Sequence, residues 1–392
     1  MHTFTKIVFT LLSAAAIAGT AACTSASAET ESSEMREIRS GEIWPDNNGV
    51  HINAHGGGIL AYDNKYYWFG EHKSDSTSSA LVGVKCYSST NLADWTDCGT
   101  ALEVVDEAGH DLERGCVLER PKVVYNPLTK KFVMWFHLEL KGKGYSAARY
   151  GVATADKPEG PYTYLRSGRV LPGVRPAGMT AEAAARADSL AKADLGDWWT
   201  ESWYKAVDDG YLNSRDLGTG QMARDQTVFV DPADGKAYHI FSSEDNLTLI
   251  IAGLSDDFTS HLGKYVRVAP AGHNEAPAIF RQGDTLWMIT SGCTGWAPNK
   301  ARMFSAKDIY GPWTQHENPC VGPNADLTFG GQSTYILTIP GTDKHIFMAD
   351  IWRPEHPSDA RYIWLPITWS KDGKPEVQWR DSWTLADLKN NI

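Results

Sequence analysis

Short apolar stretches separated by turn residues recur five times along this chain. Each copy begins with an apolar strand, passes through a turn containing Asp, Asn or Gly, and returns as a strand rich in aromatic and β-branched residues. The turn residues tolerate positive φ, which indicates hairpins. The opening hairpins of the copies lie within residues 56–73, 119–139, 224–246, 274–295 and 331–352.

This repeat predicts an all-β fold, a five-bladed β-propeller. Short antiparallel strands at regular spacing fit a sandwich, a barrel or a propeller. Five similar units of about 50 residues favour the propeller, whose sheets pack radially around an axis. Because the first strand of each blade lines that axis, the residues that open the copies are expected to converge on one central pocket.

One segment, about residues 170–215, departs from the strand pattern between the second and third copies. A helix is predicted from Met179 to Ala193 with Thr180 as its N-cap, and a second helix is expected to begin within 197–203. This helical insertion between blades two and three is either a surface ornament or a lid or pocket wall that carries exposed Trp side chains.

The N-terminal residues have the pattern of an export signal, with an apolar run that ends in small residues. We expect a signal peptide over 1–22, a polar tether over 23–40 and a catalytic propeller over 41–392. Residues 20–23 resemble a lipobox, which would place a lipid on Cys23 and attach the protein to a membrane, whereas 26–28 fit an ordinary cleavage site. The expected location is therefore the periplasm or, as a lipoprotein, the outer membrane; the alternative is secretion.

Composition narrows the classes of partner. The formal net charge is −11 and no Lys/Arg cluster stands out, so nucleic-acid binding is excluded as a function. The chain has 15 Trp and 16 Tyr, which serve blade packing and, at a few positions, stacking against sugar rings. The cysteines match no zinc motif, and Cys86 and Cys98 either form a bridge or stay as free thiols.

Polar residues stand just before or at the start of the apolar strand in each copy. Carboxylates occupy three of these positions, Glu119, Asp225 and Glu275, and Gln332 opens the fifth copy. The first copy offers His55 and Asn53 instead. A pocket in which an acid and a base flank a substrate is what hydrolysis of a glycosidic bond requires.

The motifs at these positions resemble glycoside hydrolase family 43, most closely its exo-β-1,3-galactanase-like branch. They read HINAHGGGILAYDNKYYWFGEHK, GCVLERPKVVYNPLTKKFVMWFH, MARDQTVFVDPADGKAYHIFSSEDN, HNEAPAIF with SGCTGWAPN, and FGGQSTYI. The similarity runs in order through nearly the whole mature chain. It implies a five-bladed propeller and an inverting exo-glycosidase acting on β-1,3-linked galactan of plant arabinogalactan.

The resemblance also implies roles for individual residues. Glu275 corresponds to the general acid, and Asp225 to the carboxylate that raises the pKa of that acid. The usual basic Asp of the first blade is absent, because the segment reads Asn53-Ala54-His55-Gly56. Gln332 then holds the attacking water or acts as an unusual base, and Glu119, otherwise a substrate contact, is the alternative base.

The remaining expectations concern ligands and competing functions. His55, Asn53, Trp296 and Glu71 are candidate contacts to an oligo- or polysaccharide substrate. No catalytic metal or cofactor is expected; a structural calcium or sodium ion at the axis stays open. An α-L-arabinofuranosidase or β-xylosidase of the same family is the nearest alternative, and a non-catalytic glycan-binding propeller is the alternative of another class.

Overall fold

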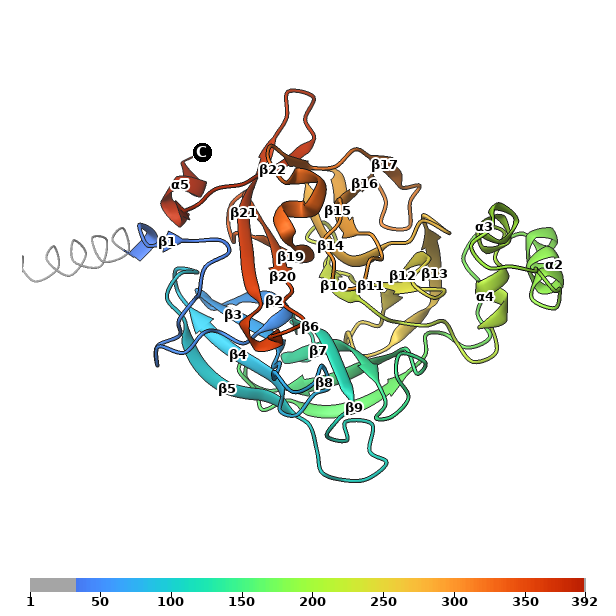
Figure 1. The fold of residues 1–392 in the computed structure, drawn as a ribbon, viewed down its shortest axis with the longest axis horizontal. Coiled ribbons are helices and arrows are strands. Elements are labelled where there is room, and N and C mark those ends of the chain that lie inside the picture. The colour runs from blue at the N-terminus through green and yellow to red at the C-terminus, as the bar shows by residue number, and fades with distance from the viewer. Residues whose placement is uncertain (1–32, 391–392) are drawn as a thin grey trace, which may run out of the picture.

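The computed structural model describes residues 33–390, which form a five-bladed β-propeller as the repeat predicts (Figure 1). The expected signal peptide and Cys23 lie outside the described residues, and so does part of the expected tether. No helix in the described part of the chain is long and apolar enough to cross a membrane.

Each blade is an antiparallel sheet that begins at the axis and ends at the rim. The innermost strands β2, β6, β10, β14 and β19 contact one another around the axis. Blade one contains β2 (His55–Tyr62), β3 (Lys65–Glu71), β4 (Gly83–Ser89) and β5 (Thr96–Glu103). Blade two contains β6 (Val117–Asn126), β7 (Lys131–Glu139), β8 (Arg149–Ala155) and β9 (Thr163–Gly168).

The remaining blades follow the same order from axis to rim. Blade three contains β10 (Gln226–Val230), β11 (Ala237–Ser243), β12 (Thr248–Leu254) and β13 (His261–Val268). Blade four contains β14 (Glu275–Gln282), β15 (Thr285–Ser291), β16 (Arg302–Ala306) and β17 (Thr314–His316). Blade five contains β19 (Gln332–Thr338), β20 (His345–Ile351), β21 (Arg361–Trp369) and β22 (Pro375–Gln378), with β18 (Cys320–Val321) added in parallel at its edge.

The two ends of the described chain meet outside the blades. Strand β1 (Glu37–Ile38) pairs with β23 (Trp383–Thr384), which leads into the short helix α5 (Leu385–Lys389). Two 3-10 turns, η1 (Ala325–Gly330) and η2 (Pro357–Asp359), lie in loops of the fifth blade. Pairing between the ends holds the N-terminal segment against the last blade.

The helical insertion lies between β9 and β10, as expected, and projects from the rim beside blade three (Figure 1). Helix α2 (Ala181–Leu190) begins after Thr180, whose side chain accepts a hydrogen bond from the Ala183 amide, so the predicted N-cap is confirmed. Helices α3 (Glu201–Asp208) and α4 (Tyr211–Arg215) follow.

A β-bulge interrupts four of the five innermost strands close to their first residues. The pairing register shifts after His55, Glu119, Glu275 and Ser333. In the second and fourth blades a Pro follows two residues after the Glu, and Pro has no N–H to give to the ladder. Bulges beside active sites re-aim side chains, so these shifts set where the strand-opening residues point.

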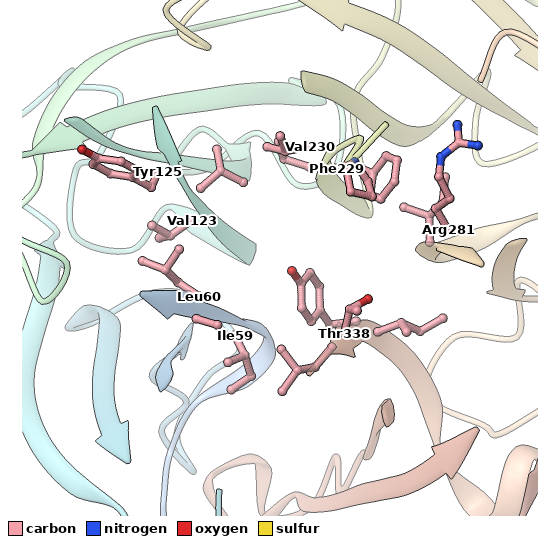
Figure 2. A pocket seen from close by; sticks show the side chains of 16 residues that line it. Ile59, Leu60, Val123, Tyr125, Phe229, Val230, Arg281 and Thr338 are labelled. Carbon is pink, nitrogen blue, oxygen red and sulfur yellow. The ribbon is translucent and has the colours of Figure 1, made fainter. Parts of the chain in front are cut away.

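The two ends of the axis differ in chemistry. The later residues of the innermost strands line a cavity of about 360 Å³ with mostly apolar side chains, among them Ile59, Val123 and Phe229 (Figure 2). The first residues of the same strands line a polar cavity of about 370 Å³ at the other end. All charged residues that were predicted from strand starts belong to this second end.

Candidate active site

The polar cavity brings together four of the predicted residues from four different blades. Glu119, Asp225, Glu275 and Gln332 all line it, together with Glu71 and Trp296. Each of the four stands at the axial end of an innermost strand or, for Asp225, one residue before it. The expected convergence of the strand starts on one pocket therefore holds for blades two to five.

Burial and a neighbouring carboxylate raise the pKa of Glu275. Burial raises its pKa to about 7, and the negative charge of Asp225 acts in the same direction. The Asn246 amide donates to Oε1 over 2.6 Å and holds the carboxyl in place. A carboxyl group with a pKa near 7 is suited to donating a proton at neutral pH.

Arg120 connects Asp225 to Gln332 beneath the cavity. Its guanidinium lies 2.9 Å from Asp225 Oδ2 and donates to Gln332 Oε1 over 2.6 Å. A second donor, Trp352 Nε1, reaches the same oxygen over 2.8 Å. Two donors thus occupy the carbonyl side of the Gln332 amide, which opposes a tautomer with a proton on that oxygen.

The amide nitrogen of Gln332 faces the acid. It donates to Ser291 Oγ over 2.9 Å and lies 3.4 Å from Glu275 Oε2. An inverting pair of carboxyl groups is separated by about 6.5–9.5 Å to admit water. Gln332 and Glu275 are in contact here, so a substrate ring and a water need this contact to open.

Glu119 is held as an anion by hydrogen-bonding and charged partners, of which Lys73 and His137 are buried. Burial opposes its charge, but a hydrogen bond from His137, the charge of Lys73 and a hydrogen bond from Tyr145 outweigh burial and lower its pKa to about 2. His137 lies between Glu119, at 3.1 Å, and Glu139, at 3.0 Å. These carboxylates outweigh the burial of His137 and raise its pKa to about 9, so its ring is an imidazolium.

The protonation of His137 also argues against a metal ion bound by the residues around it. Glu119, His137 and Asp225 bring one ligand atom each within 4.8 Å of one another. Both ring nitrogens of His137, however, hydrogen bond to carboxylates, and an imidazolium offers no lone pair to a cation. The group does not fit a metal ion.

Two predicted substrate contacts lie elsewhere. His55 is fully buried; its ring stacks on Tyr362 at 5.5 Å, away from the cavity lining. Asn53 is bound to the backbone of Lys73 through two hydrogen bonds of 2.8 Å. His55 thus packs blade one against blade five, Asn53 fixes the chain just after β3, and neither side chain lines the cavity.

Gly56 explains part of the triple glycine in blade one. Its φ is 60°, and a Cβ placed there would lie 2.7 Å from Glu71 Oε1. The missing side chain therefore makes room for the Glu71 carboxylate, which pairs with Lys73 over 2.6 Å at the cavity wall. The close approach to Gly56 therefore comes from the adjacent strand β3.

Several wall residues do not follow from the repeat. Lys73, Tyr145, Asn246 and Trp352 come from loops or strand ends beyond the opening strands. Trp296, which was expected, lines the cavity and is 42% exposed, and its ring centroid lies 5.5 Å from that of Trp352. Arg120 had a signal in the sequence, because it directly follows a predicted site residue.

Comparison with known proteins finds similarity to glycoside hydrolases. Residues 184–375 match the model of glycosyl hydrolases family 43. A solved GH43 β-1,3-galactosidase in complex with galactodeoxynojirimycin is 56% identical, with a TM-score of 0.85, and the match covers 88% of this chain and 100% of that one. No curated protein matches the chain.

Two solved exo-β-1,3-galactanases are also similar. The enzyme of Phanerochaete chrysosporium, solved with β-1,3-galactotriose, is 30% identical over 89% of this chain and 68% of that chain, with a TM-score of 0.69. The enzyme of Clostridium thermocellum is 32% identical over 88% of this chain and 66% of that chain, with a TM-score of 0.71.

Proposed function

The chain belongs to glycosyl hydrolase family 43, and from this premise we propose that it is an inverting exo-glycosidase that hydrolyses β-1,3-linked galactan. The observation that carries the proposal is Glu275, whose pKa is raised to about 7 by burial and by Asp225. A site that only binds glycan has no need of a protonated carboxyl group at neutral pH. The similar galactosidase and galactanases support galactan as the substrate.

In this reaction Glu275 protonates the leaving oxygen, and Asp225 keeps its pKa high. Glu119 binds the substrate as a fixed anion, since a carboxylate with a pKa of about 2 is a weak base. Gln332 orients the attacking water through its amide, once the sugar ring separates it from Glu275. Trp296 and Glu71 contribute the sugar-binding wall.

We propose that no cofactor and no structural ion are required. The Lys122 amino group is buried near the axis, where it donates to the Gly56 carbonyl over 2.8 Å and lies 3.4 Å from the Arg120 carbonyl. The Lys122 amino group thus interacts with two carbonyl oxygens that could otherwise serve as ligands of a calcium or sodium ion. Treatment with a chelator is expected to leave both activity and melting temperature unchanged.

The N-terminal sequence pattern supports export of the protein. We further propose that Cys23 is lipidated. A lipidated form partitions with membranes after expression with its signal peptide, and Cys23→Ser releases it. If the wild-type protein is exported without lipid, cleavage occurs at the later site instead.

The catalytic proposal is tested by product identity. The protein is incubated with β-1,3-galactan, arabinan and aryl glycosides, and the released sugar and its anomeric form are read by NMR. We expect galactose released first as the α-anomer, because the β-linkage is inverted. Release of arabinose or xylose, or of β-galactose, contradicts the proposal, and binding without release supports the non-catalytic alternative.

A further inference from the structure

Two Trp side chains on the helical insertion are not used by the fold or by the active site. Trp198 and Trp199 lie just before helix α3, and each is 55% exposed. Exposed large apolar groups that lie together mark interaction sites more often than isolated ones do. Their ring centroids are 6.4 Å apart.

Each of these rings is supported on one side by another ring. Trp198 stacks on the buried Trp203 at 5.6 Å with an angle of 20°. Trp199 stacks on His273 at 5.5 Å with an angle of 28°. The backbone φ of Trp199 is 67°, which a bulky residue rarely adopts and which persists only where its surroundings hold it. One face of each Trp ring is therefore packed against another ring, and the rest of the side chain is exposed to solvent.

The insertion itself is fastened to blade three. Trp203 packs with Val207, Leu212 and Leu247 in one buried cluster. Arg267 of β13 donates to the Val207 and Asp208 carbonyls over 2.6 and 2.9 Å. Arg215 pairs with Asp245 over 2.6 Å. These contacts fix the insertion, and with it the surface formed by Trp198 and Trp199, to the rim of the propeller.

The same contacts connect the two Trp side chains to residues that adjoin the catalytic cavity in the chain. His273, which supports Trp199, is two residues before Glu275 in the chain. Asp245, which fastens Arg215, directly precedes Asn246, whose amide holds Glu275. The Trp pair thus lies on the blade-three side of the propeller, outward from the cavity, and Trp199 touches a residue that leads into the strand of Glu275 (Figure 1).

We propose that Trp198 and Trp199 bind sugar units of the galactan chain beyond the bond that is cut. This rests on the proposed function. Below the cavity the axis is filled by the buried Arg120 and Lys122, so only the chain end enters and the remaining sugars must leave over the rim. Flat aromatic faces suit the C–H faces of pyranose rings, and neutral rings suit a neutral polysaccharide.

The test compares a long substrate with a short one. In Trp198→Ala/Trp199→Ala we expect KM for long β-1,3-galactan to rise about tenfold, while kcat and hydrolysis of an aryl β-galactoside stay unchanged. The matched control is Trp369→Ala, which removes an exposed Trp from β21 outside the insertion and is expected to leave both substrates unaffected. Circular dichroism and melting temperature check that the variants are folded.

A second variant, Trp198→Ala, leaves the stack of Trp199 on His273 in place. For this variant we expect a smaller rise of KM than in the double variant, and only on the polymer. An unchanged KM on galactan in both variants overturns the inference. Equal losses on both substrates also overturn it, because the Trp pair would then support Glu275 instead of binding sugar. If the wild-type protein releases no galactose, the proposed function fails first, which is a separate result.

Discussion

Replacing Asp225 by Asn removes one negative charge from beside the proposed acid. Asp225 is paired with Arg120 at 2.9 Å, and these two charges act on Glu275 in opposite directions. In Asp225→Asn the repulsion that raises the pKa of Glu275 is lost, and the attraction of Arg120 is no longer balanced. The pKa of Glu275 is therefore expected to fall, although its burial is unchanged.

The magnitude follows from the size of such interactions. A neighbouring like charge shifts a pKa by about one unit or more, and one unit corresponds to about 1.36 kcal/mol. With a pKa of about 7, half of Glu275 is protonated at pH 7. A fall of about one unit leaves roughly a tenth protonated, so kcat/KM is expected to drop about fivefold at pH 7 from protonation alone.

The assay is the pH profile of kcat/KM on galactan, whose alkaline limb reports the acid of the free enzyme. We expect this limb to move to lower pH in Asp225→Asn, and the loss to shrink toward pH 5. Asp231→Asn is the matched control: it breaks a comparable 2.6 Å pair, with Arg281, near the apolar end of the axis. It is expected to lower stability without moving the limb.

Two results would refute this reasoning. An alkaline limb that stays in place in Asp225→Asn shows that the charge does not act on Glu275. A loss of equal size at every pH shows that Asp225 orients the substrate and does not set the pKa of the acid.

Four further outcomes are expected. Glu275→Gln should reduce galactan hydrolysis by about 10²–10⁴-fold with the fold intact, and less on aryl glycosides with good leaving groups; near-normal galactan turnover would contradict its role. Gln332→Ala should cripple turnover without rescue by azide, whereas rescue of Glu119→Ala by azide would identify Glu119 as the base. Trp203→Ala should cost about 3–5 kcal/mol of packing in the insertion, measured by denaturant unfolding, and a silent variant would show that the insertion is not fastened there. Cys98 has its pKa lowered to about 6, chiefly by a hydrogen bond with Cys86, so iodoacetamide should label it well below pH 8, which mass spectrometry can check.

The propeller could be predicted from the sequence because one hairpin pattern recurs along the chain. Five copies of one hairpin pattern predicted five blades, and the Thr180 cap predicted the start of a helix. Glu119 and Glu275 were predictable from the same periodicity, because the backbone that opens the innermost strand of a blade lies beside the axis. The convergence of these two carboxylates on one pocket was therefore predictable before any tertiary contact was known, whereas their roles came from the resemblance to family 43.

The rest depended on contacts that periodicity does not encode. His55 stands at the same bulge position in blade one as Glu119 does in blade two, yet Tyr362 from blade five draws its ring into the core. Tyr145 and Asn246 reach the cavity from loops whose paths depend on the neighbouring blades. Position in a repeat predicted where a backbone lies, and packing decided where the side chain went.

The bulges at the strand starts separate the chemistry of this propeller from its stability. The residue at each shifted position owes its direction to a local change of backbone pairing, whereas the apolar residues after it hold the blade. One such position carries an acid, one an anion and one a buried imidazole on the same backbone frame. Substitution at these few points can therefore change the chemistry of the pocket while the scaffold persists, provided that the new side chain fits the contacts by which Arg120 joins blades two, three and five.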